Sequence, residues 1–157
     1  MAEMREYLEI QIIYIAANNC VFVGKLLILS PFMIRSILFV ALGGALGSVA
    51  RFLLSRFLQG SIITAFPVGT MVVNILGCLL IGIFYGLADR NGMLDANMKL
   101  FLTVGFCGGF TTFSTFMNES LQLFRSDNIL YGALYAGGSV FLGLVAVFMG
   151  LQIVKAI

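Results

Sequence analysis

Four long apolar runs follow one another along the chain, and short polar segments separate them. The runs cover residues 36–54, 68–88, 100–124 and 129–154. An α-helix needs about 20 apolar residues to cross the hydrocarbon core of a bilayer, and each run reaches roughly that length. The pattern therefore predicts an all-α membrane protein with four transmembrane helices.

Charged side chains lie at the ends of these runs, where a bilayer tolerates them. Arg51 and Glu119 reach furthest into a run. For Glu119 we expect exposure at the membrane interface rather than a role in proton transfer. Arg51 has two equal interpretations: its side chain extends to the membrane surface, or it concentrates anions at the mouth of a pore.

The composition supports a membrane location, because 61% of the residues are hydrophobic and only 10% are charged, whereas soluble domains are about a quarter charged. A net charge of +2 is too small to indicate nucleic-acid binding. The chain has no histidine, and its three cysteines, Cys20, Cys78 and Cys107, are isolated from one another. Zinc sites need clustered ligands, so we interpret the cysteines as small apolar side chains.

The segment before the first run, residues 10–32, is apolar but is interrupted by two asparagines and a lysine. Acidic residues precede it, which argues against a signal peptide. It is a further helix, an amphipathic segment on the membrane surface, or the product of an upstream start codon, with the working protein beginning at Met33. We favour the last, because four helices are complete without it. The predicted organisation is an N-terminal extension, residues 1–32, and a four-helix domain, residues 33–157.

Small residues recur at a spacing of four in three of the runs. The pairs are Gly43 and Gly47, Gly82 and Gly86, and Ser139 and Gly143. In lipid, helices associate through close backbone approach and polar contacts rather than hydrophobic burial, so such faces mark helix contacts. We expect the helices to pack at these positions.

Few polar side chains remain inside the runs. Thr70 and Asn74 lie four residues apart on one face of the second run, and Tyr135 and Ser139 form a similar face on the fourth. An amide in hydrocarbon must find partners or line water. Asn74 therefore either bonds a neighbouring helix or lines a polar path.

The third run contains the unusual segment GFCGGFTTFSTF. A regular helix would place Phe110, Phe113 and Phe116 in one aromatic stripe, which is normally a packing surface. However, the stripe follows Gly108-Gly109, an expected interruption of the helix, and hydroxyl groups are interleaved with it. Broken helices at membrane depth occur where protein or a water-filled path satisfies the freed backbone groups. The interruption therefore predicts a site.

The side chains available in the runs suit an anion. No acidic residue lies at mid-span to bind a cation or carry protons, whereas amide and hydroxyl donors are present. The phenylalanine ring is electropositive at its edge, so an edge-on ring attracts a small anion. Backbone carbonyls that are released at a helix break can instead hold a small cation.

At these residues the sequence closely resembles the Fluc/CrcB family of fluoride channels. Three motifs carry the resemblance, in order from about Met33 to the C-terminus: GGALGSVARF, FPVGTMVVNILGCLLIG and GFCGGFTTFSTF. The resemblance implies a dual-topology homodimer, in which two four-helix subunits lie antiparallel in the inner (plasma) membrane with two fluoride pores. It also implies passive, fluoride-selective export and no enzymatic activity.

The resemblance further implies roles for individual residues. The rings of Phe113 and Phe116 would turn their edges to fluoride. The rest of the fluoride path would comprise Asn74, Thr115, Tyr135, Ser139, Thr70 and Arg51. The backbone carbonyls of Gly108 and Thr111 would bind a structural Na⁺ on the two-fold axis of the dimer. Gly143 departs from the family pattern, because some members carry a second serine there.

The positive charges are nearly balanced between the two expected sides of the membrane. One side would hold Arg35, Arg90, Lys99 and Lys155, and the other would hold Arg51, Arg56 and Arg125. Four against three leaves almost no bias, so the positive-inside rule does not fix one orientation, as dual topology requires. A translated extension would shift the count to six against three, which is a second reason to place the start at Met33.

Other classes of protein remain as alternatives. A small proton-coupled exporter would have a similar size and topology, but it needs a membrane-embedded carboxylate, and the first run has none. A non-transporting assembly protein has no sequence feature in its support. An enzyme is disfavoured, because no nucleophile–base pair or metal cluster is visible.

Overall fold

The computed structural model describes residues 31–61, 66–90, 94–126 and 129–157, and within these ranges all secondary structure is helical. The predictions made for the N-terminal extension and for Cys20 therefore lie outside the described residues. The chain divides into two compact units, with the boundary after Ile37. In the first unit, the hydroxyl of Ser36 donates to the carbonyl of Phe32 inside the opening turns of a helix. Apart from the first residues of the opening helix, up to Ile37, the features that follow belong to the second unit, Leu38–Ile157.

Among the described residues, four helical segments are long and apolar enough to cross a membrane, as the four apolar runs predict. Three of them are single helices: α2 (Pro31–Ser61), α3 (Val68–Asp89) and α7 (Ile129–Ala156). Each contains its predicted run and extends beyond it by up to several residues at one or both ends. The extension is expected, because helical hydrogen bonding continues into the polar residues that flank an apolar run.

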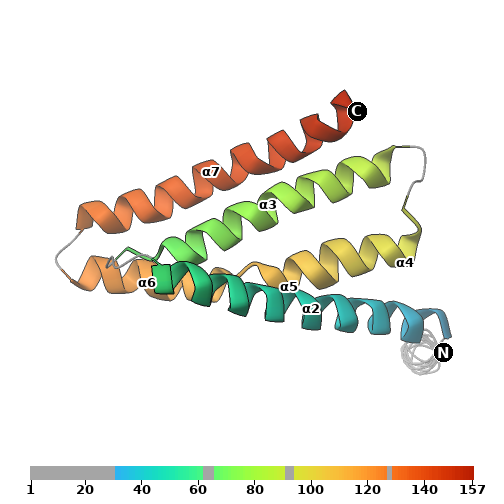
Figure 1. The fold of residues 1–157 in the computed structure, drawn as a ribbon, viewed down its shortest axis with the longest axis horizontal. Helices are drawn as coiled ribbons and strands as arrows, with labels where there is room; N and C mark the ends of the chain where they lie inside the picture. The colour runs from blue at the N-terminus through green and yellow to red at the C-terminus, as the bar shows by residue number, and fades with distance from the viewer. Residues whose placement is uncertain (1–30, 62–65, 91–93, 127–128) are drawn as a thin grey trace, which may run out of the picture. The chain divides into compact units, whose positions relative to one another are not determined.

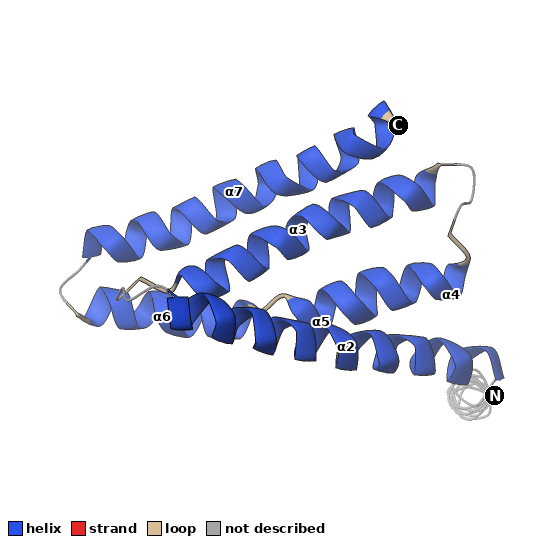
Figure 2. Cartoon of the chain, in the orientation of Figure 1, coloured by secondary structure: helices blue, strands red, loops and turns tan. Residues whose placement is uncertain are grey.

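The third segment is assembled from several pieces. They are α4 (Ala96–Lys99), the π-helix η1 (Leu100–Cys107), α5 (Gly108–Phe110) and α6 (Phe113–Arg125). Thr111 and Thr112 separate α5 from α6 in an extended conformation, which Figure 2 shows as a short loop between two helices. The π-helix and the extended residues make this segment different from a regular membrane helix over much of its length. π-Helical turns are frequent at functional sites.

Helices α3 and α7 lie side by side and run in the same direction (Figure 1). Glycines make the contact close: a Cβ atom at Gly82 would overlap the carbonyl oxygen of Val147, and one at Gly86 would lie 3.0 Å from Cβ of Val154. A Cβ atom at Gly150 of α7 would likewise overlap the carbonyl oxygen of Leu79 on α3. The predicted packing face of the second run is therefore confirmed, and it aligns α3 with α7 along most of their lengths.

Helix α2 packs on the third segment through its own glycine face. A Cβ atom at Gly43 would overlap the carbonyl oxygen of Phe101, and one at Gly47 would overlap that of Phe106. Gly109 reciprocates, because a Cβ atom there would lie 3.0 Å from Cα of Gly44. The small residues at a spacing of four thus mark a real helix contact, as close packing in lipid requires.

Replacing Gly47 by alanine is expected to destabilise the fold by about 1–3 kcal/mol, because the added methyl group meets backbone atoms that cannot rotate away. Gly44→Ala is the matched control on the same helix, since a Cβ atom there would lie 3.9 Å from its nearest neighbour, the carbonyl oxygen of Gly105. Thermal unfolding of both variants in detergent, followed by circular dichroism, measures the difference. Equal melting temperatures would contradict the close contact of α2 with η1.

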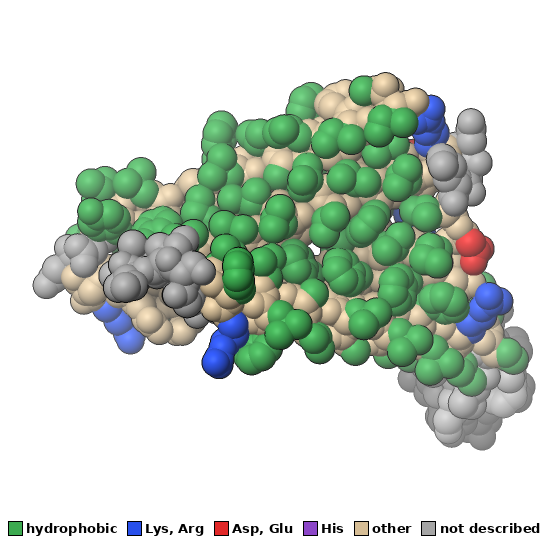
Figure 3. Space-filling view, viewed as in Figure 1, with side chains coloured by type: hydrophobic (Ala, Val, Ile, Leu, Met, Phe, Trp, Pro, Cys, Tyr) green, Lys and Arg blue, Asp and Glu red, His purple; other side chains and the backbone are tan. Residues whose placement is uncertain are grey.

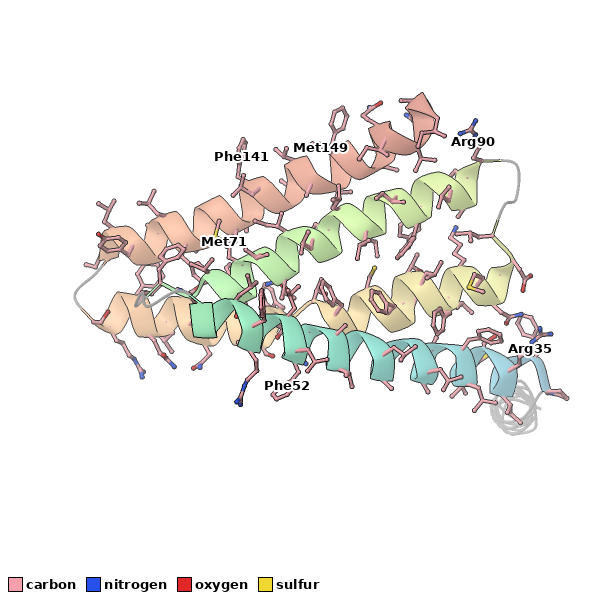
Figure 4. The ribbon with its side chains drawn as sticks, viewed as in Figure 1. Arg35, Phe52, Met71, Arg90, Phe141 and Met149 are labelled. Carbon is pink, nitrogen blue, oxygen red and sulfur yellow. The ribbon has the colours of Figure 1, made fainter. Side chains whose placement is uncertain are left out.

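The outer faces of the helices are apolar, and hydrophobic side chains cover most of the visible surface (Figure 3). Phe52 on α2 and Phe141 and Met149 on α7 point away from the neighbouring helices (Figure 4). Such exposure would be unfavourable in water and is expected of a surface that faces lipid tails or another subunit.

Candidate functional site

The interruption of the third segment lies three residues beyond the position that the sequence predicts. Gly108 is helical, with φ −63° and ψ −37°, whereas Thr111 (φ −83°, ψ 158°) and Thr112 (φ −144°, ψ 113°) are extended. The expectation that Gly108-Gly109 break the helix is therefore wrong. Gly109 serves the close approach to Gly44, and this packing requirement explains a glycine there without any break.

Asn74 on α3 holds the extended residues in place. Its side-chain Oδ1 accepts a hydrogen bond from the backbone N–H of Thr112 at 2.8 Å, and its Nδ2 donates to the carbonyl of the same residue at 3.1 Å. The amide thus makes the same two hydrogen bonds to the backbone of Thr112 that a residue of a neighbouring β-strand would make. Because backbone groups that leave a helix are costly when they stay unpaired away from water, this reciprocal pair stabilises the extended conformation of Thr112.

Helix α6 begins with a side-chain cap. The Thr112 hydroxyl accepts a hydrogen bond from the backbone N–H of Thr115 and donates to the Thr115 hydroxyl. A threonine cap of this kind satisfies an N–H group that has no partner within the helix. Thr115, which the sequence analysis places in the fluoride path, is therefore engaged in starting α6.

Arg51 lies against the other side of the interruption. Its Nε donates to the carbonyl of Gly109 at 3.2 Å, and the Ser48 hydroxyl is 3.5 Å from the same oxygen. This carbonyl belongs to the last turn before the extended residues. Part of the Arg51 guanidinium is thus committed to the backbone of the third segment, and the two interpretations of this side chain both stay predictions.

Glu119 on α6 is a site residue that the sequence analysis missed. Its carboxylate accepts hydrogen bonds from the hydroxyls of Thr70 at 2.8 Å and Tyr135 at 2.7 Å. It therefore joins α3, α6 and α7, and the expectation of simple interfacial exposure is wrong. The hydroxyl hydrogens of Thr70 and Tyr135 point to Glu119. The spacing in the sequence could have indicated this role, because Glu119 follows Phe116 by three residues and therefore lies on the same face of the helix.

Phe110, Phe113 and Phe116 have different surroundings. Phe116 is 5% exposed, and its ring lies 5.2 Å from the ring of Tyr135. Phe113 is 73% exposed, with its ring centre 6.1 Å from that of Phe116. Phe110 is buried and stacks on Phe106. The aromatic stripe of a regular helix does not form, because the extended residues separate Phe110 from the other two rings.

A cavity of about 270 Å³ opens between α3, α6 and α7. It is lined by Asn74, Cys78, Phe113, Phe116, Ser139, Val140, Gly143, Leu144 and Val147. The Ser139 hydroxyl oxygen is buried and has no hydrogen-bond partner among the described residues. A buried polar atom without a partner is costly, so this hydroxyl is an unsatisfied polar position in the lining of the cavity.

The structure brings together four of the residues that the sequence analysis assigns to the fluoride path: Asn74, Phe113, Phe116 and Ser139 line one cavity. Thr70 and Tyr135 lie beside it in the Glu119 network. The remaining predicted residues, Thr115, Arg51, Gly108 and Thr111, lie around the interruption and outside the cavity lining.

The four apolar segments and their exposed apolar faces define a multi-pass membrane protein. Residues 38–151 match the model of a family described as CrcB-like protein, Camphor Resistance (CrcB). The chain belongs to this CrcB family, as the resemblance of its motifs predicted.

Several relatives are similar over nearly their whole length. A protein from Flavobacterium psychrophilum is 48% identical over 121 residues, which cover 77% of this chain and 98% of the relative. One from Phocaeicola vulgatus is 51% identical over 119 residues, covering 74% and 96%, respectively. Both carry the name fluoride-specific ion channel FluC. These names describe ion channels rather than enzymes.

Proposed function

We propose that this protein is a fluoride-selective ion channel that lowers cytoplasmic fluoride by passive export across the inner (plasma) membrane. The observation that carries the proposal is the buried Ser139 hydroxyl, which has no partner among the described residues and lies in the same cavity as the Asn74 amide. The names of the relatives give the identity of the ion. The alignments cover at least 96% of the length of both relatives, so the comparison concerns nearly the whole of each relative.

The chemistry of the cavity suits a small, strongly hydrated anion. Its lining offers few polar atoms, and the ring of Phe116 reaches it from a buried position. The electropositive edge of a phenylalanine ring attracts an anion, while hydroxyl and amide donors replace part of its hydration. No carboxylate is among the described residues that line the cavity, which favours an anion over a cation.

The functional unit that we propose is an antiparallel, dual-topology homodimer with two pores. Phe113 supports it, because a ring that is 73% exposed beside a cavity is available to a second subunit. The near-equal number of positive charges on the two sides of the four helices supports insertion in both orientations. In this assembly the extended residues Thr111 and Thr112 would lie at membrane depth, where they interrupt the third transmembrane segment.

A structural Na⁺ at the centre of the dimer is the remaining part of the proposal. Thr111 is extended, so its carbonyl does not point along the helix axis. A Cβ atom built at Gly108 would meet nothing within 4 Å, so the backbone there is accessible. These carbonyl oxygens are of the type that coordinates small cations at helix breaks, and a two-fold axis would double their number. The ion would supply positive charge that holds the two subunits together.

Liposomes that contain the purified protein and potassium fluoride are expected to release fluoride when a K⁺ ionophore is added. Release should need no proton gradient, because a channel conducts down the electrochemical gradient of its ion alone. A fluoride electrode measures the rate, and protein-free liposomes give the background. Efflux that is absent would contradict the proposal, and efflux that strictly follows a pH gradient would favour a proton-coupled exporter instead.

A further inference from the structure

Polar groups on α3 and α7 face each other at regular intervals. The two helices run in the same direction (Figure 1). Residues four positions further along both helices therefore again lie opposite each other, and each such step rises by about 6 Å. The first level pairs Thr70 with Tyr135 through Glu119. The second level holds Asn74 and Ser139, which line the same cavity.

The third level pairs Cys78 with Gly143. Both line the cavity, and a Cβ atom at Gly143 would lie 3.3 Å from Sγ of Cys78. The sulfur therefore lies next to the space that a side chain of residue 143 would occupy. Among the described residues that line the cavity at this end, Val140, Leu144 and Val147 offer only hydrocarbon. The thiol is thus the polar side-chain group of the third level.

The second level holds an unsatisfied polar group. The Ser139 hydroxyl is buried and unpaired within the described part of the chain, and Ser139 lines the cavity. An ion that leaves Ser139 and moves away from Glu119 next reaches Cys78, one helical step along α3. A free thiol is a weak hydrogen-bond donor, and Cys78 is free.

We propose that the Cys78 thiol is a third anion-contacting group of the fluoride path, placed where Gly143 contributes no side chain. This inference rests on the proposed channel function and adds a residue that the sequence analysis interpreted as apolar filler. It also makes the cavity a modification site for small, neutral thiol reagents. A group attached to Sγ would project into a cavity of about 270 Å³ and obstruct the ion.

The test is fluoride efflux from liposomes before and after treatment with methyl methanethiosulfonate. The thiolate of Cys78 attacks the methylthio sulfur, a new S–S bond forms, methanesulfinate leaves, and the thiol proton passes to water. We expect the treated wild-type protein to lose at least about tenfold in efflux rate. Dithiothreitol should reverse the loss by reducing the new disulfide. Peptide mass spectrometry determines which cysteine carries the label.

Cys107 provides a matched control, because it is also a free cysteine but is 2% exposed and lies outside the cavity lining. The reagent should inhibit Cys107→Ala and Cys20→Ser as strongly as the wild type, whereas Cys78→Ser should resist it. The efflux rate of each treated variant is compared with that of the same variant before treatment. Cys78→Ser should also conduct about tenfold faster than Cys78→Val, because the hydroxyl restores a donor and the isopropyl group does not.

The possible outcomes are distinct. Undiminished efflux from protein that mass spectrometry shows to be labelled at Cys78 would overturn this inference and leave the channel function intact. Equal inhibition of the wild type and Cys78→Ser would also overturn it. Labelling of Cys107 with none at Cys78 would contradict the position of the thiol in the cavity. Absence of fluoride efflux from untreated wild-type protein would overturn the channel function and the inference together.

Discussion

Replacing Asn74 by alanine is expected to lower the fluoride efflux rate by about 100-fold, equivalent to roughly 2.7 kcal/mol. The side chain makes both hydrogen bonds to the backbone of Thr112 and also lines the cavity. Alanine would leave the N–H and the carbonyl of Thr112 without these partners. Each unpaired, buried backbone group costs about 1–3 kcal/mol, so the extended residues should lose their fixed position and the cavity its shape.

Asn74→Asp separates the two bonds. The carboxylate still accepts from the N–H of Thr112 but cannot donate to its carbonyl, and it places an anion beside the path. We expect efflux below that of the wild type for both variants, together with a lower melting temperature for Asn74→Ala. A fluoride electrode and circular dichroism supply the two measurements. Wild-type efflux from Asn74→Ala would show that neither the pairing with Thr112 nor the amide in the cavity matters.

Replacing Phe116 by isoleucine is expected to lower fluoride efflux by about 10- to 100-fold while the protein stays folded. Isoleucine keeps much of the apolar volume but has no ring, so the electropositive edge is lost from the cavity. Phe116 is well placed for this role, because it is 5% exposed, packs against Tyr135 and lines the cavity. Phe113→Ile should also reduce efflux, by an amount that depends on how a second subunit covers the exposed ring.

Phe110→Ile is the control for these variants. Phe110 belongs to the same motif and is as buried as Phe116, but it stacks on Phe106 outside the cavity lining. Its replacement should lower the melting temperature and leave the efflux rate per folded protein within about threefold, because a core substitution of this kind costs mainly packing energy. If all three variants conduct equally well, the rings are packing residues and the ring-edge mechanism is wrong.

The position of the interruption could not be read from the sequence alone. Two adjacent glycines have a low helix propensity, so Gly108-Gly109 was the natural prediction. In the structure these glycines stay helical, and Thr111 and Thr112 are extended. Local propensity was overruled by two non-local contacts, the approach of Gly109 to Gly44 and the pairing of Thr112 with Asn74.

Glu119 and Cys78 show the same limit. In sequence, Glu119 lies near the polar end of a run and Cys78 lies within an apolar one, so interfacial exposure and packing were reasonable interpretations. In the structure Glu119 accepts two hydrogen bonds from other helices, and Cys78 lines a cavity. Neither role follows from the chemistry of the residue by itself, because each depends on what the neighbouring helices present to it.

The sequence by itself determined the four membrane-spanning segments, the glycine faces at which they pack, and the family. Apolar runs of sufficient length dictate membrane helices wherever they occur, and small residues at a spacing of four dictate a close contact face whatever the partner. The tertiary structure alone decided where the third segment is interrupted, which backbone groups Asn74 pairs with, and which side chains share the cavity. These features depend on the register between helices, and that register is set by contacts between residues far apart in the chain.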